Sequence, residues 1–245
     1  MAEYDTIRSV GVGAGVRIDE GLRAHMNKVY GLMSVAMVVT AGVAWAVGTS
    51  DALLAIFRDP MTLRPNILGW VVMFAPLAMV FAFGAMLNRM SAAAAQVFFY
   101  AFAAVMGLSL AWIFKVFTGV SIAQTFLITA IAFAGLSLYG YVTKRDLSAM
   151  GTFLMMGLIG LLVAMIVNIF IASSALAFAI SVIGVLIFAG LTAYDTQNIK
   201  NTYLQHAHAM DSEWLGKAAI MGALNLYMDF INLFMFLLQF MGNRE

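Results

Sequence analysis

The sequence contains no cysteine, only three prolines and three histidines, and few charged residues. Without cysteine the chain cannot form disulfides, cysteine-ligated zinc sites, iron–sulfur clusters or a thiol nucleophile. Charged residues make up 10% of the 245 residues, whereas they make up about 25% of a soluble domain. The formal net charge is +1 and there is no block of like charges, so the sequence argues against nucleic-acid partners.

Apolar residues dominate instead, at 63% of the chain, where soluble domains have about 45–50%. The 13 basic and 12 acidic residues are too few to cover the outside of a water-soluble fold of this size. The sequence therefore predicts that the solvent of this protein is lipid.

Seven apolar runs are long enough to cross a bilayer, which takes about 20 residues. We place them at residues 29–47, 67–87, 92–114, 121–142, 150–171, 176–198 and 218–241. The connections leave no room for a second domain. The prediction is an all-α membrane protein, a seven-transmembrane helical bundle over residues 29–245, preceded by a flexible cytoplasmic leader over residues 1–28.

Basic residues predict the orientation of the bundle, because cytoplasmic loops carry an excess of Lys and Arg. With the N-terminus inside, nine basic residues face the cytoplasm and four face the other side. The nine are Arg8, Arg17, Arg23, Lys28, Arg89, Lys144, Arg145, Lys200 and Lys217. Seven spans then place the C-terminus outside.

Only two acidic residues fall inside the predicted spans, Asp195 in the sixth and Asp229 in the seventh. Asp229 lies near the middle of its run, with Asn225 four residues before it and Asn232 three residues after it, so one helix face carries a polar stripe. Acids in the middle of a membrane usually mark ion or proton paths. We therefore favour a functional role over simple burial.

Asp195 lies close to the end of its run, together with Tyr194, Thr192 and Gln197. This polar cluster is compatible with a side chain that reaches the headgroup region, and equally with a vestibule at the cytoplasmic mouth. Both interpretations stay open at this point.

The run boundaries place Asp195 and Asp229 at depths that differ by about eight residues, or about 12 Å. The two acids can therefore meet only if the last helix begins late, after Gly222, or if a water-filled cavity reaches down to Asp229.

Two segments are more specific than composition. They are GLTAYDTQNIK at residues 190–200 and ALNLYMDFINLF at residues 223–234, and FAPL at residues 74–77 is a weaker third. They resemble the last two helices and the second helix of the Bax inhibitor family, the transmembrane Bax-inhibitor-motif proteins. The resemblance is closest to the bacterial YccA-type branch.

The resemblance implies six helices around a central seventh and a pH-sensitive, calcium-permeable leak closed by a pair of acids. The two acids of the family fall on Asp195 and Asp229, and a basic residue that can latch onto the first falls on Arg89. Some members also carry a carboxylate midway along the second helix. Residues 77–79 offer none here.

The first hypothesis is thus a leak for calcium and protons in a bacterial inner membrane, without enzymatic activity and without a tightly bound cofactor. Two carboxylates in a low dielectric cannot easily both ionise, so Asp195 and Asp229 should titrate as a coupled pair. They would bind calcium weakly and transiently, since two carboxylates do not supply the 6–8 oxygens of a tight site.

Two alternatives belong to other classes. One is a modulator of membrane proteases or quality control that binds another membrane protein, as the resemblance to some bacterial relatives implies. An intramembrane aspartyl protease would also carry the Tyr194-Asp195 pair, but Leu226 and Met228 stand where such an enzyme has glycines, and no Pro-Ala-Leu follows Asp229.

Overall fold

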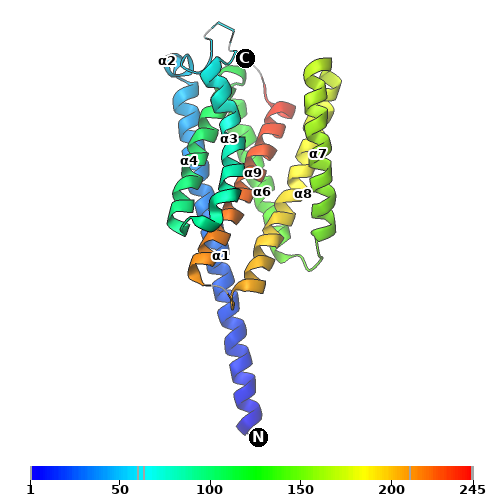
Figure 1. Cartoon of the computed structure of the whole chain (residues 1–245). Coiled ribbons are helices and arrows are strands. Elements are labelled where there is room, and N and C mark those ends of the chain that lie inside the picture. The colour runs from blue at the N-terminus through cyan, green and yellow to red at the C-terminus, as the bar shows by residue number, and fades with distance from the viewer. Residues whose placement is uncertain (1, 60, 63, 210, 244–245) are drawn as a thin grey trace.

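The computed structural model describes residues 2–59, 61–62, 64–209 and 211–243, with side chains from residue 20 onward. Within this part of the chain, seven helices are long and apolar enough to cross a membrane, as predicted (Figure 1). They are α1 (Ala2–Gly48), α3 (Ile67–Met86), α4 (Ala92–Leu110), α6 (Gly119–Val142), α7 (Ser148–Ile171), α8 (Ser174–His206) and α9 (Ser212–Met241). Short helices α2 (Asp51–Leu54), η1 (Leu87–Arg89) and α5 (Ile113–Val116) lie in the connections.

Polar side chains fix where several of these helices begin. The Asn66 side chain accepts a hydrogen bond from the Gly69 N–H at the start of α3, and the Asp211 side chain accepts one from the Trp214 N–H at the start of α9. Such caps satisfy N–H groups that have no partner inside the helix.

The structure differs from the predicted bounds at two places. The backbone of the predicted flexible leader continues the first span, so that α1 begins at Ala2. Most of the predicted linker at residues 199–217 is helical, because α8 runs on to His206 and α9 already begins at Ser212. Apolar runs indicate where a chain leaves hydrocarbon, whereas a helix can continue into the headgroup region with polar residues.

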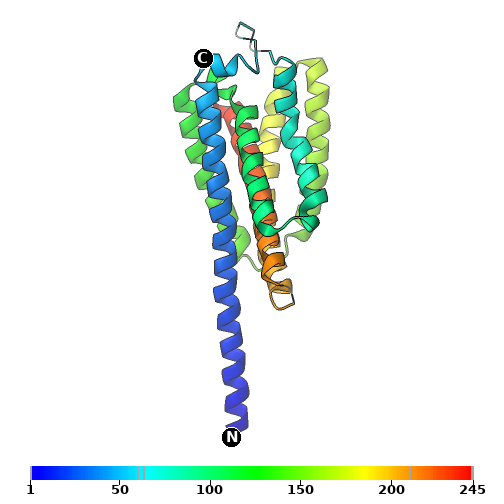
Figure 2. The same ribbon diagram turned by 60° about the vertical axis from the view of Figure 1, so that its left-hand side comes forward.

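Helix α9 occupies the centre of the bundle, as the family resemblance implied. About 67% of its most apolar window is buried, compared with 11–44% in the other six spans. It packs against α8, α1, α6 and α4, whereas α3 packs mainly on α4 and α7 on α8 at the periphery (Figures 1 and 2).

Tyr227 anchors α9 to two other helices. Its side chain is completely buried, and its ring meets the rings of Phe99 and Phe102 on α4 edge-on. Its hydroxyl lies 2.6 Å from Oγ1 of Thr40 on α1, and Thr40 in turn donates to the carbonyl oxygen of Ala103 on α4. The hydroxyl of this buried tyrosine therefore has the hydrogen-bond partner that a buried polar group needs.

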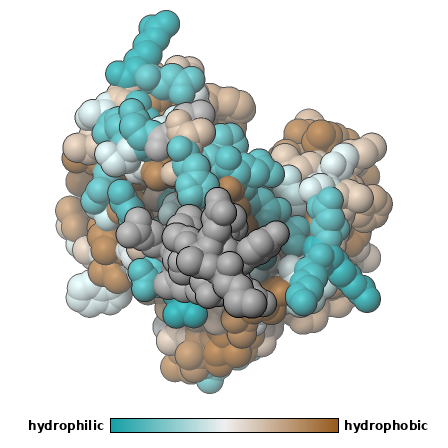
Figure 3. Space-filling model, turned by 90° about the horizontal axis from the view of Figure 1, so that it is seen from below, coloured by the Kyte–Doolittle hydropathy of each residue, from teal (hydrophilic) through white to brown (hydrophobic). Residues whose placement is uncertain are grey.

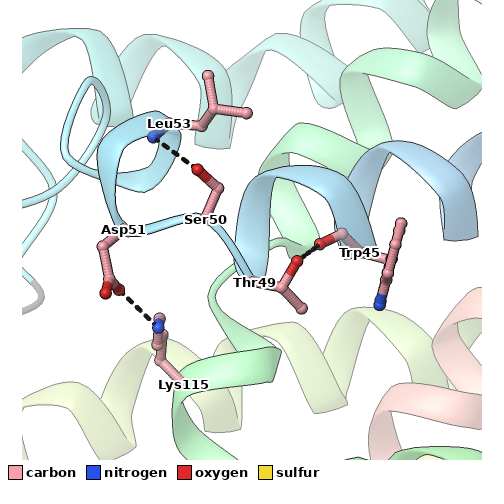
Figure 4. Close-up of polar contacts among 6 residues, drawn as sticks. All are labelled: Trp45, Thr49, Ser50, Asp51, Leu53 and Lys115. Atoms are coloured by element: carbon pink, nitrogen blue, oxygen red, sulfur yellow. Dashed lines mark hydrogen bonds and ion pairs between the residues drawn. The ribbon is translucent and has the colours of Figure 1, made fainter.

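The two ends of the bundle are polar. At the end where the chain finishes, Nζ of Lys115 lies 2.7 Å from a carboxylate oxygen of Asp51, and the Ser50 hydroxyl accepts a hydrogen bond from the Leu53 N–H (Figure 4). From the opposite end, hydrophilic residues gather on the face seen in Figure 3, and hydrophobic residues lie around its edge. This distribution fits a protein that spans a bilayer between two polar end faces.

The orientation in the membrane is a prediction that reporter fusions can test. Fusions inserted at residues 143–149 and 207–211 should report cytoplasm, and a fusion after residue 245 should report the opposite side, because the basic residues gather at the first of these ends. A cytoplasmic signal from the C-terminal fusion would contradict this orientation.

Candidate functional site

The structure brings the two membrane acids together. Asp195 on α8 is half-buried and Asp229 on α9 is 4% exposed. The two carboxyl groups lie close enough to interact with each other. Two ionised carboxylates have no donor, so a hydrogen bond between these groups would require a shared proton. Among the described residues, Oδ2 of Asp229 is buried without a hydrogen-bond partner.

The packing of α8 on α9 explains how the acids meet. A Cβ added at Gly222 would lie 2.9 Å from Cγ1 of Ile199, and one added at Gly184 would lie 2.6 Å from Cγ of Phe236. These close approaches set the antiparallel register of the two helices.

In this register Asp195 lies opposite Leu226, three residues or about 4.5 Å from the level of Asp229. The depth difference of about eight residues was therefore wrong. It was counted from the ends of the apolar runs, and neither α8 nor α9 ends there.

A cavity of about 250 Å³ opens from the N-terminal end of the bundle toward the pair. Its lining includes His25, Lys217 and Asn225. Asn225 is one helical turn before Asp229 on the same helix, so the cavity ends about 6 Å short of the level of the buried acid. Neither acid lines this cavity, and neither do Thr192, Tyr194 and Gln197, so the vestibule at Asp195 stays a prediction.

Arg89 stands at the end of η1 with an exposed side chain. The described residues show no ion pair between it and Asp195. Its neighbours Leu87 and Asn88 line the cavity. A latch between Arg89 and Asp195 therefore stays a prediction.

The other polar residues singled out in the sequence lie in three different settings. Asn225 borders the cavity. The Asn232 amide donates to the carbonyl oxygen of Met228 within its own helix. The Tyr194 ring occupies the space in front of Gly151 on α7, which makes it part of the packing between α7 and α8.

A chain of hydroxyl groups next to Asp195 was not found from the sequence. The Tyr30 hydroxyl on α1 lies 2.6 Å from Oγ of Ser137 on α6, and this oxygen lies 2.9 Å from Oγ1 of Thr196 on α8. Thr196 donates to the Thr192 carbonyl oxygen, so the chain ends on backbone rather than on the acid. The sequence indicates this chain only by the spacing of Thr192 and Thr196, which lie one helical turn apart. This spacing does not reveal their partners on other helices.

No group of three or more His, Cys, Asp or Glu side chains that could hold a metal ion occurs in the described part of the chain. What the site offers chemically is one pair of neighbouring carboxyl groups and a cavity of mixed polarity on one side.

These features define the class of the protein: a polytopic helical membrane protein with a buried carboxyl pair between its last two helices. The chain matches, over residues 22–245, the family described as inhibitor of apoptosis-promoting Bax1. It therefore belongs to the Bax inhibitor family, as its motifs indicated.

Several bacterial proteins are similar over nearly their whole length. The inner membrane protein YbhL of Escherichia coli is 46% identical over 225 residues, which cover 92% of this chain and 94% of YbhL. A protein of Rickettsia prowazekii is 45% identical over 229 residues, covering 93% of this chain and 92% of the relative. A membrane protein of Streptococcus pyogenes is 34% identical over 231 residues, covering 93% and 96%.

Proposed function

We propose that this protein is a pH-sensitive cation leak of a bacterial inner membrane, with calcium as a permeant ion and Asp195 and Asp229 as its gate. The observation that carries the proposal is the close approach of the two carboxyl groups between α8 and the central helix α9. The similarity to an inner membrane protein supports the location.

The pair can act as a gate because its two protonation states have opposite effects on the helices that carry it. With one shared proton, the hydrogen bond holds α8 against α9. Loss of that proton leaves two negative carboxylates side by side in a low dielectric, and they repel each other. Separation of the two helices would extend the cavity at Asn225 past Asp229 toward the other end of the bundle.

The same two carboxylates suit the passage of calcium rather than its storage. Calcium prefers oxygen ligands, and a tight site uses 6–8 of them. A pair of carboxylates with a few water molecules binds more weakly, and conduction requires that an ion leave the site as well as enter it.

The proposal is tested by calcium flux into proteoliposomes that contain the purified full chain, measured in steps between about pH 5 and pH 8, where a coupled carboxyl pair in a membrane can titrate. We expect a flux above that of protein-free liposomes and a clear dependence on pH. Flux equal to that of the protein-free liposomes at every pH would contradict the proposal.

Arg89 gives a separate prediction within the same assay. If the guanidinium pairs with ionised Asp195 and repels calcium, Arg89→Ala should raise the leak at neutral pH. Lys144→Ala, which removes an exposed positive charge at the same end of the bundle, is the matched control. Equal leaks in the parent and in folded Arg89→Ala would show that Arg89 only helps to set the orientation.

A further inference from the structure

A second and larger cavity, of about 800 Å³, lies along the side of the bundle between α1 and α6. Residues from Arg23 to Ala41 form one wall, residues from Phe126 to Tyr141 form the other, and Phe230 of α9 lies between them. The cavity extends over 19 residues of α1, a rise of about 27 Å. We refer to it as the lateral groove.

The lateral groove exists because α1 and α6 do not pack closely on each other. In the described structure α1 packs mainly on α4 and α9, and α6 packs on α8 and α9. Small side chains face the space between them, among them Ser34 and Ala41 on α1 and Ala130 and Ala134 on α6. The groove therefore depends on small side chains encoded in the sequence as well as on the positions of the two helices.

Polarity changes along the groove. Arg23, Asn27 and Tyr141 line it at the end where α1 enters the bundle, whereas Val38 and Phe126 line it farther along. A molecule that fits both parts has a polar head at the first end and an apolar chain at the second.

The polar end is also positively charged. Arg23 is exposed, and the described residues include no ion pair to it. Lys200 donates to the carbonyl oxygen of Tyr141, a groove residue, and Lys144 and Arg145 follow directly after α6. Each basic residue near a membrane surface adds about 1 kcal/mol to the attraction of acidic lipid headgroups.

The length of the groove suits an acyl chain. One leaflet of hydrocarbon is about 15 Å deep, half of the bilayer core. An acyl chain of one leaflet thus fits within the length of the apolar part.

We propose that the lateral groove binds an acidic glycerophospholipid, with its phosphate near Arg23 and an acyl chain between Ala134 on α6 and Val38 on α1. The bound lipid would fill the space that separates α1 from α6. It would also lie beside the hydrogen bond between Tyr30 and Ser137, two residues that line the groove.

The experiment uses the full chain in liposomes of phosphatidylcholine with a small fraction of phosphatidylglycerol that carries a photoreactive group on its acyl chain. After illumination, labelled residues are located by mass spectrometry. We expect labels on the groove faces of α1 and α6, and their displacement by unlabelled phosphatidylglycerol at lower amounts than by unlabelled phosphatidylcholine.

Two variants with matched controls make the test specific. Ala134→Trp, which fills the groove, should abolish groove labelling, whereas Ile131→Trp at an exposed position of α6 outside the groove should not. Arg23→Gln should raise the amount of phosphatidylglycerol needed by about fivefold, the equivalent of one basic contact. Lys28→Gln, on the same helix but outside the groove lining, should have no effect.

Labels spread evenly over the exposed faces of α3 and α7, or equal displacement by the two unlabelled lipids, would overturn the proposal. So would unchanged labelling in Ala134→Trp and Arg23→Gln with both variants folded. The experiment measures labelling by the lipid and does not measure ion flux, so its outcome is independent of the proposed leak.

Discussion

Replacing Asp229 by Asn should reduce the pH response of the leak by about tenfold or more, the equivalent of about 1.4 kcal/mol. The amide removes one of the two groups that share the proton, so Asp195 can lose its proton without repulsion from a second charge. Calcium flux in proteoliposomes at about pH 5 and about pH 8, the ends of the interval in which the pair is expected to titrate, gives the comparison.

Asp146→Asn is the matched control, because it removes an exposed acid from the loop before α7. The Asp146 carboxylate accepts hydrogen bonds from the side chain and the backbone N–H of Ser148, which hold its pKa below the usual range. It is therefore ionised throughout the assay, and its removal should leave the pH response unchanged. A full pH response in Asp229→Asn would exclude Asp229 from the gate.

The second large effect is expected at Gly140, where α6 touches α8. A Cβ at this position would collide with the carbonyl oxygen of Ala193, two residues before Asp195. Backbone cannot move away as a flexible side chain can. Gly140→Ala should therefore destabilise the protein by about 2–3 kcal/mol, seen as a lower unfolding temperature in detergent, and should disturb the leak.

Gly135→Ala on the same helix is the control for this substitution. An added Cβ at Gly135 meets no atom within 4 Å, so the change should gain about 0.5–1 kcal/mol from the better helix propensity of alanine. Equal stability of the two variants would mean that α6 and α8 are not in the close contact described here.

The spans could be predicted from the sequence because hydrocarbon thickness sets a length that apolar runs must match. The ends of α8 and α9 could not, since polar residues such as Lys200 and Glu213 can extend a helix outside the hydrocarbon. The register between these helices depends on Gly222 and Gly184 as contact points. Nothing in the sequence identifies which of the 21 glycines lie at a helix contact.

Only part of the candidate site could be predicted from the sequence, because some of its residues become recognisable only when the helices are assembled. Asp195 and Asp229 stand out because charges inside a bilayer are costly and rare. Ser137 and Thr196 do not stand out, because single hydroxyl groups are common in membrane helices and reveal their partners only when the helices are assembled. The lateral groove lies between faces of α1 and α6 that do not pack on each other. It cannot be recognised from the sequence of either helix alone.

A double-mutant cycle shows whether Asp195 and Asp229 act as one proton-sharing unit, as proposed. Calcium flux is measured for the parent, Asp195→Asn, Asp229→Asn and the double variant at steps between about pH 5 and pH 8. His25→Gln serves as control, because His25 lines the cavity and histidine titrates in this interval. We expect a retained pH response in His25→Gln, altered responses in both single Asp variants, and a double variant that resembles one of the two single variants. Two separable effects that sum in the double variant would contradict this proposal.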